Sequence, residues 1–186
     1  MRGSLVAGRY ANALFELAVE KDMAEEIYHD ALTVSDISRQ SRDLRTFFHA
    51  PVIQKDLKIK VLKELFEKKI GQAMLTFMLV MVRKNREKYI PEISTQVVEI
   101  YKEYKNILTV HFKAPVSPDS VIRKNVLELM TQFTKANIDL VEEIDHSLVG
   151  GFVLSWKDLQ YDVSIRKQIE QLKRGVAKVN LYVKGF

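Results

Sequence analysis

The 186-residue sequence contains no cysteine. This absence excludes disulfide bonds, thiolate metal sites and thiol nucleophiles together, and it is compatible with a reducing compartment. The N-terminal stretch MRGSLVAGRYANALF has no long apolar core and no cleavage site, so we expect no signal peptide. Hydrophobic residues make up 47% of the chain and charged residues 28%, which indicates a soluble globular protein with enough apolar material for a core.

Motifs of nucleotide-binding and hydrolytic sites are also absent. The adjacent pair Gly150 and Gly151 has neither the GxxxxGK[ST] nor the GxGxxG spacing, and strand-like residues follow it instead of a helix. The pair more simply marks a bend or bulge before a strand, where a close backbone approach leaves no room for a side chain. There is no GxSxG elbow and no recognisable order of Ser, His and Asp. We therefore expect no catalytic residue and no cofactor.

Metal-binding patterns are absent too. The chain has four histidines, His29, His49, His111 and His146. None of them has HxxxH or HExxH spacing, so structural roles are favoured over a metal site. The acidic cluster of Glu142, Glu143 and Asp145 has no accompanying ligand motif, and it fits the solvated edge of a strand.

The positive charge is not concentrated. The net charge is +5; residues 1–105 carry 18 basic and 15 acidic residues, and residues 106–186 carry 11 and 9. A surface that follows a phosphate backbone would cluster its charge. The densest basic run, RKNREK (residues 83–88), is interrupted by Asn85 and Glu87, and we interpret it as a solvated helix end, with an anionic partner as the alternative.

Apolar spacing divides the chain near Asn106. Before it, helical spacing predicts helices over residues 23–40 and 42–49, around 57–66, and from 90 to 104 with Pro91 in the first turn. After it, strands are predicted at 107–114, 138–144, 152–156 and 159–162, with a helix capped by Ser117 after the first strand and a last helix from Ile165. We expect a mainly α protein: a helical bundle over residues 1–105 and a small α/β domain over 106–186.

Two segments of the N-terminal half are more apolar than a bundle requires. The first helix carries two neighbouring apolar stripes, Val6, Tyr10, Leu14 and Leu17 beside Ala7, Ala11, Phe15 and Ala18. In AMLTFMLVMV (residues 73–82) the one polar residue is Thr76, and the run is far shorter than the roughly 20 residues of a membrane span. These segments are either central core helices or the walls of a groove for an amphipathic partner helix.

The stretch IDHSLVGGFVLSWKDLQYDVSIRKQIEQL resembles the C-terminal signature of the ATP synthase delta subunit family, which includes the mitochondrial oligomycin-sensitivity-conferring protein. The parts of that signature are Gly150, Gly151, Asp162, Ser164 and Arg166. The turn WKDLQYD stands where the family often has Gly-Asp, and a valine stands where glycine is frequent between Asp and Ser. Both departures affect the geometry of the turn.

Two further stretches carry the same resemblance. VAGRYANALFELAVEK is similar to the family's opening helix, and NREKYIPEI stands where the family has Asn-x-Arg before its sixth helix. The resemblance implies an N-terminal six-helix bundle that binds N-terminal helices of alpha subunits, and a C-terminal domain that holds the end of the b-subunit stalk. It also implies a non-catalytic stator role in proton-driven ATP synthesis, with peripheral attachment at the cytoplasmic face of the bacterial inner membrane.

The resemblance also locates a candidate binding site between the first and fifth helices. The residues expected to contact an alpha-subunit helix are Tyr10, Ala13 and Leu14 on the first helix, with Thr76 and Val80 on the fifth. Two other interpretations stay open on the residues alone. One is a basic nucleic-acid-binding module, and the other is a small enzyme of unrecognised type.

Overall fold

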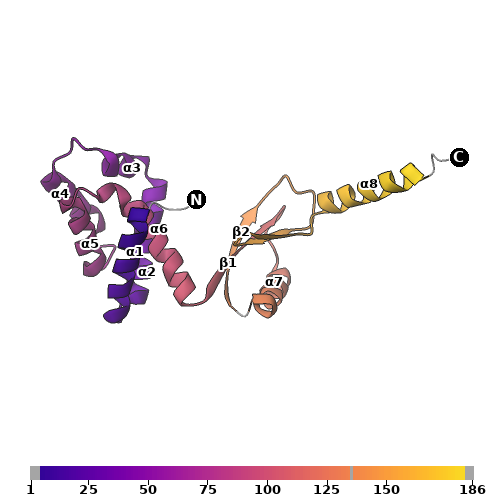
Figure 1. Cartoon of the computed structure of the whole chain (residues 1–186), viewed down its shortest axis with the longest axis horizontal. Helices are drawn as coiled ribbons and strands as arrows, with labels where there is room; N and C mark the ends of the chain where they lie inside the picture. The colour runs from indigo at the N-terminus through magenta and orange to yellow at the C-terminus, as the bar shows by residue number, and fades with distance from the viewer. Residues whose placement is uncertain (1–4, 135, 183–186) are drawn as a thin grey trace. The chain divides into compact units, whose positions relative to one another are not determined.

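The computed structural model of the chain describes residues 5–134 and 136–182. The chain divides into two compact units, Met1–Tyr104 and Lys105–Phe186. The first unit is helical and the second combines a four-stranded sheet with two helices (Figure 1). A mainly helical protein with a smaller mixed part is therefore confirmed.

The first unit is built from helices joined by short connections. They are α1 (Leu5–Glu20), α2 (Ala24–Gln40), α3 (Arg42–His49), α4 (Lys55–Phe66), α5 (Gln72–Arg83), the 3-10 helix η1 (Glu87–Tyr89) and α6 (Ile90–Tyr104). Helix α6 packs against α1 and α2, and α4 packs against α5. Of the two apolar stripes on α1, the alanine-rich one is buried: Ala7, Ala11, Phe15 and Ala18.

Local sequence explains where these helices begin and end. The Ser41 side chain accepts a hydrogen bond of 3.1 Å from the Leu44 amide and so caps α3. At the end of α5, Asn85 has a φ of +55°, and the Arg86 amide donates to the Met81 carbonyl at 2.9 Å. Asparagine tolerates this left-handed conformation better than most residues, so Asn85 ends the helix.

A buried ion pair joins two elements of this unit. Lys58 of α4 lies 2.5 Å from Glu87 of η1, and the two side chains are 3% and 13% exposed. The pair fixes the segment that follows α5 against α4.

The second unit contains a mixed sheet in the order β2-β1-β3-β4. Its strands are β1 (Ile107–Ala114), β2 (Asn137–Ile144), β3 (Val153–Trp156) and β4 (Leu159–Asp162), and its helices are α7 (Ser120–Thr134) and α8 (Ile165–Tyr182). Strands β1 and β2 are parallel, with Val110 opposite Leu140, and α7 connects them. Strands β3 and β4 form an antiparallel hairpin whose turn contains Lys157 at a φ of +49°.

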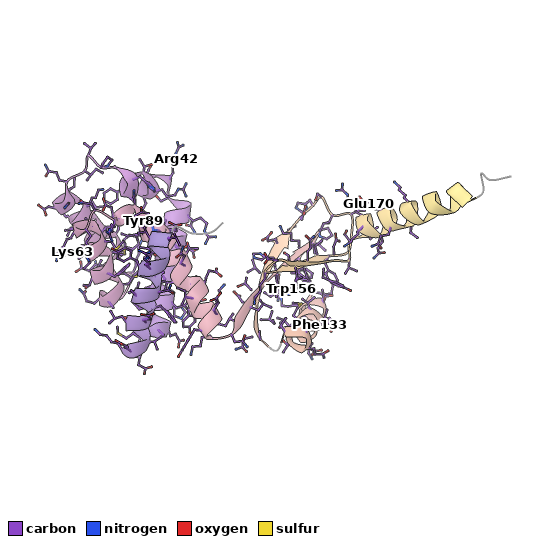
Figure 2. The ribbon with its side chains drawn as sticks, viewed as in Figure 1. Arg42, Lys63, Tyr89, Phe133, Trp156 and Glu170 are labelled. Atoms are coloured by element: carbon purple, nitrogen blue, oxygen red, sulfur yellow. The ribbon has the colours of Figure 1, made fainter. Side chains whose placement is uncertain are left out.

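One face of this sheet carries the core of the second unit. Alternate residues of β1 are buried together with residues of α7 and β3: Leu108, Val110, Phe112, Ala114, Val126, Met130 and Leu154. Trp156 of β3 packs against this core, whereas Phe133 of α7 is 76% exposed (Figure 2).

The predicted start of α7 was wrong. The helix begins at Ser120, and its cap is Asp119, whose carboxylate accepts a hydrogen bond of 2.8 Å from the Ile122 amide. Ser117 lies outside the helix, since the prolines on both sides of Val116 and Ser117 favour an extended backbone there. Of the apolar side chains of α7, Val126 and Met130 face the sheet and are buried, while Val121 stays exposed.

Candidate partner-binding groove

A groove of about 490 Å³ lies between α1 and α5. Its lining residues are Ala13, Leu14, Leu17, Ala18, Lys21, Met23, Ile27, Gln72, Ala73, Thr76, Phe77 and Val80. Most of these side chains are apolar, and alanines stand on both walls. Small side chains let a helix backbone approach closely, while the larger apolar neighbours offer surface for burial.

Four of the five predicted groove residues line this groove, namely Ala13, Leu14, Thr76 and Val80. The fifth, Tyr10, lines a neighbouring pocket of about 470 Å³, and Ala13 lines both. Ala13 and Thr76 are exposed, so a partner can reach them. Leu14 is 5% exposed and belongs mainly to the core, where it forms the floor of the groove.

The pocket beside the groove contains residues that the sequence reasoning did not assign to the site. Its lining is Val6, Arg9, Tyr10, Ala13, Arg86 and Tyr89. Arg86 donates a hydrogen bond to the Tyr10 hydroxyl, and its guanidinium lies 5.4 Å from the centre of the Tyr10 ring. On the sequence alone, the run around Arg86 is interpreted as a solvated helix end. Asn85 directly precedes Arg86 and can end a helix, so it was the one feature of the sequence that indicated a fixed turn at this point.

A buried carboxylate supports the start of α5. The Gly71 amide donates a hydrogen bond of 2.9 Å to the carboxylate of Asp30 of α2. Asp30 is 7% exposed. Burial raises the pKa of Asp30, and the hydrogen bond from Gly71 partly opposes that shift. A carboxylate at a helix N-terminus is electrostatically favourable, so Asp30 anchors the α5 wall of the groove to α2.

In the second unit, the glycine pair of the signature lies against the start of α8. A Cβ at Gly150 would lie 2.5 Å from Ile165 Cδ1, and the Gly150 carbonyl accepts a hydrogen bond of 3.0 Å from the Ile165 amide. Gly151 has a φ of +77°, and a Cβ there would overlap the Val163 carbonyl oxygen. The pair thus permits a close backbone approach, which is the geometry expected from the sequence.

The remaining signature residues shape the first turn of α8. Asp162 accepts a hydrogen bond of 2.9 Å from the Ser164 amide, and the Ser164 hydroxyl accepts one of 3.3 Å from the Lys167 amide, so Ser164 caps the helix. The hydrogen bonds from Ser164 lower the pKa of Asp162. Arg166 lies 3.7 Å from Glu170 one turn later.

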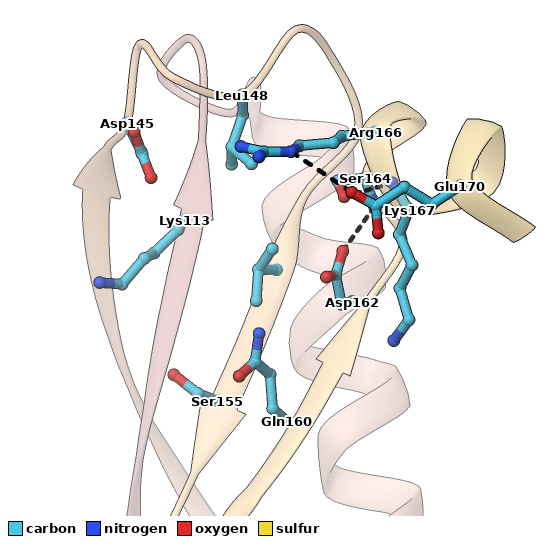
Figure 3. A pocket seen from close by; sticks show the side chains of 11 residues that line it. Lys113, Asp145, Leu148, Ser155, Gln160, Asp162, Ser164, Arg166, Lys167 and Glu170 are labelled. Atoms are coloured by element: carbon cyan, nitrogen blue, oxygen red, sulfur yellow. Dashed lines mark hydrogen bonds and ion pairs between the residues drawn. The ribbon is translucent and has the colours of Figure 1, made fainter.

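These residues border a polar hollow of about 570 Å³ on the sheet face opposite the α7 core (Figure 3). On this face Glu143 lies 2.8 Å from Lys113 and 3.0 Å from His111. The hydrogen bond from Lys113, followed by that from His111, lowers the pKa of Glu143. A general acid needs a pKa raised toward neutrality, so the shifts of Glu143 and Asp162 run opposite to that requirement.

The part of the chain that the structure describes contains neither a metal-ligand cluster nor a membrane-spanning helix. Within residues 5–134 and 136–182, no group of three or more histidine, aspartate or glutamate side chains could hold a metal ion. In the same residues, none of the helices combines the length and the apolar character needed to cross a membrane.

Comparison with known proteins identifies the family. The family model described as the ATP synthase delta (OSCP) subunit matches residues 6–176. The chain belongs to this family. The ATP synthase subunit delta of Christiangramia forsetii is 30% identical over 98% of both chains, and that of Chloroherpeton thalassium is 29% identical over 94% of this chain and 95% of its own. The resemblance found in the sequence is thereby confirmed.

A solved structure shows the same fold over nearly the whole length. One chain of the Toxoplasma gondii mitochondrial ATP synthase hexamer superposes with a TM-score of 0.69 at 18% identity, covering 94% of this chain and 98% of that one. Proteins of the delta (OSCP) family are peripheral-stalk components of F-type ATP synthase, and this is the function of the present subunit. The family match does not support the alternative of a nucleic-acid-binding module.

Proposed function

We propose that this delta-family subunit is a non-catalytic stator link with two binding regions. Residues 1–105 act as a six-helix bundle that binds N-terminal helices of alpha subunits through the groove between α1 and α5. Residues 106–186 hold the end of the b-subunit stalk. Chemistry then takes place on other subunits, and this one needs neither a cofactor nor a metal.

The observation that carries the proposal is the apolar groove between α1 and α5. An amphipathic helix binds such a groove by burying apolar side chains spaced three and four residues apart. Each side chain buried there contributes on the order of 1.5–3 kcal/mol, less the cost of ordering the partner. Several anchors are thus enough for a lasting attachment.

The b-subunit site is supported by apolar side chains that the second unit leaves exposed. On α7 they are Val121, Ile122, Leu129 and Phe133, and on the first turns of α8 they are Ile165, Ile169 and Leu172. Single exposed apolar residues are normal, but helical stripes of them fit a partner helix.

A stator must resist torque through its attachments, because the rotating parts pull against whatever holds the catalytic hexamer still. Attachment to alpha subunits through the first unit and to the b stalk through the second meets this requirement. The subunit is then held peripherally at the cytoplasmic face of the bacterial inner membrane through the complex alone.

The test is a titration of the full chain, followed residue by residue by NMR, with a peptide of the alpha-subunit N-terminus. We expect Ala13→Asp to weaken binding at least tenfold, about 1.4 kcal/mol, because the carboxylate loses water when the peptide covers it. Asn12→Asp is the matched control: it adds the same charge at an exposed neighbouring position that does not line the groove.

Far-UV circular dichroism of both variants separates binding from folding. Since Ala13 is exposed, both variants should keep the helical content of the wild type. A folded Ala13→Asp variant that binds the peptide as tightly as Asn12→Asp would contradict the proposed groove.

A further inference from the structure

Three cations mark the ends of the groove and its neighbouring pocket. Arg9 and Arg86 line the pocket, and Lys21 lines the groove. Arg9 lies on α1, and Lys21 directly follows the last residue of that helix, twelve positions after Arg9, which corresponds to about 18 Å at the helical rise. The lining of both hollows contains no aspartate or glutamate, so every charged residue that lines them is a cation.

In the part of the chain that the structure describes, none of Arg9, Lys21 and Arg86 forms an ion pair. Elsewhere in the chain cations do find carboxylates, as Arg123 does with Glu142 at 2.6 Å. The charge along the groove is therefore available to a partner.

Arg86 is held in position before any partner arrives. Asn85 fixes the backbone turn in front of it, and the Tyr10 hydroxyl and ring hold the guanidinium. The Tyr10 ring in turn packs edge-on against Phe77 of α5, with 6.5 Å between ring centres. A guanidinium has five N–H donors, and the bond to Tyr10 uses one of them. The others remain free to bind a carboxylate, for which Arg is geometrically suited.

We propose that the groove selects an amphipathic helix with a carboxylate at each end of its apolar face. One carboxylate pairs with Arg86 and Arg9, and the other pairs with Lys21, roughly twelve helical residues away. This inference rests on the proposed function, since it states the chemistry that the alpha-subunit helix must carry. The apolar contacts supply affinity, and the two ion pairs fix the register of the helix and speed its encounter with the groove.

Nucleic acid is a poorer occupant of this surface. A phosphate backbone carries a charge at every nucleotide and would need cations along its whole path. Between Arg9 and Lys21, α1 presents apolar residues such as Leu14 and Leu17 to the groove. A helix with an apolar middle and acidic ends complements this pattern of charge.

The experiment uses a designed 20-residue helical peptide with an apolar stripe and Glu at positions 4 and 16. Three matched peptides replace one or both Glu by Gln. Calorimetric titration of the full chain at low salt should show about three-fold tighter binding for each Glu, and high salt should remove this advantage. Arg86→Gln combined with Arg9→Gln should abolish the advantage of one Glu, and Lys21→Gln should abolish that of the other. Lys84→Gln, at an exposed position outside both linings, should leave both unchanged.

The outcomes separate this inference from the proposed function. If the Gln peptide binds wild type as tightly as the Glu peptide, and Ala13→Asp weakens both, the groove stands and the acidic recognition is wrong. If neither peptide binds, or both bind Ala13→Asp as tightly as wild type, the groove itself is wrong. Displacement of the Glu peptide by an equimolar DNA oligonucleotide would also overturn the inference.

Discussion

At Gly151 the surrounding backbone leaves no room for a side chain. Its φ is +77°, and a Cβ would overlap the Val163 carbonyl oxygen and lie 2.9 Å from Ser164 Cα. A left-handed conformation costs other residues about 1–2 kcal/mol, and overpacking against backbone adds about 1–3 kcal/mol. We expect Gly151→Ala to destabilise the second unit by about 2–5 kcal/mol, measured by urea unfolding with the fluorescence of Trp156, the single tryptophan.

Gly150→Ala is the matched control. Its Cβ would meet the Cδ1 end of Ile165, a flexible side chain that can move aside, so the destabilisation should be smaller. Equal unfolding midpoints for the two variants would show that the backbone contact of Gly151 does not matter.

Some contacts of individual residues were predictable from the sequence, and others were not. The glycine pair before an apolar strand correctly indicated a close backbone approach, because such an approach is a local requirement. The contact between Arg86 and Tyr10 joins residues 76 positions apart, and it depends on how α1 and α5 pack. No local pattern in the sequence contains that information.

Among the elements, the junction of α4 with η1 depends on one buried ion pair. The side chain of Lys58 is 3% exposed and lies 2.5 Å from Glu87, beside the segment that supplies Arg86. Removing one partner of a buried pair leaves an uncompensated charge and costs about 3–5 kcal/mol. We expect Lys58→Met to lower the free energy of unfolding of the helical unit by this amount, measured by far-UV circular dichroism in urea.

Two further variants test that explanation. Lys58→Met combined with Glu87→Leu should recover most of the loss, because apolar residues can replace a buried pair at little cost. Lys60→Met, at an exposed position on the same helix, should stay within about 0.5 kcal/mol of wild type. If Lys58→Met is as mild as Lys60→Met, the junction does not depend on the pair.

Among the element boundaries, those of α3 were predictable from the sequence. Ser41 caps α3 and the predicted bounds 42–49 are those observed. For α7, both Ser117 and Asp119 can cap a helix, and the Ile122 amide bonds to Asp119 because the neighbouring prolines favour an extended backbone at Ser117. The burial of its apolar stripe also depended on where the sheet lies, so helical spacing alone did not distinguish Val126 from Val121.

For the whole molecule, acid should weaken the second unit. Hydrogen bonds from Arg123 lower the pKa of Glu142, and those from Ser164 lower the pKa of Asp162. A lowered folded pKa gives stability that is present above the unfolded value and lost as pH falls through the folded value. Burial raises the pKa of Asp30 in the first unit, so protonating that carboxyl in acid relieves a cost of folding.

The measurement is urea unfolding at pH 7 and pH 3, with Trp156 fluorescence for the second unit and the dominant helical circular dichroism for the first. The fluorescence midpoint should fall once the pH drops below about 4.5. A fluorescence midpoint that is the same at pH 3 and pH 7 would contradict the assignment of these carboxylates.

The most direct test of the stator role is reconstitution of proton-driven ATP synthesis. F-type ATP synthase from the same source, stripped of its delta subunit, is placed in vesicles with an imposed proton gradient, and ATP formation is measured after the purified chain is added. We predict that wild type and Asn12→Asp restore synthesis to the level of the intact complex, while Ala13→Asp does not. Undiminished synthesis without the chain, or full restoration by folded Ala13→Asp, would contradict the account.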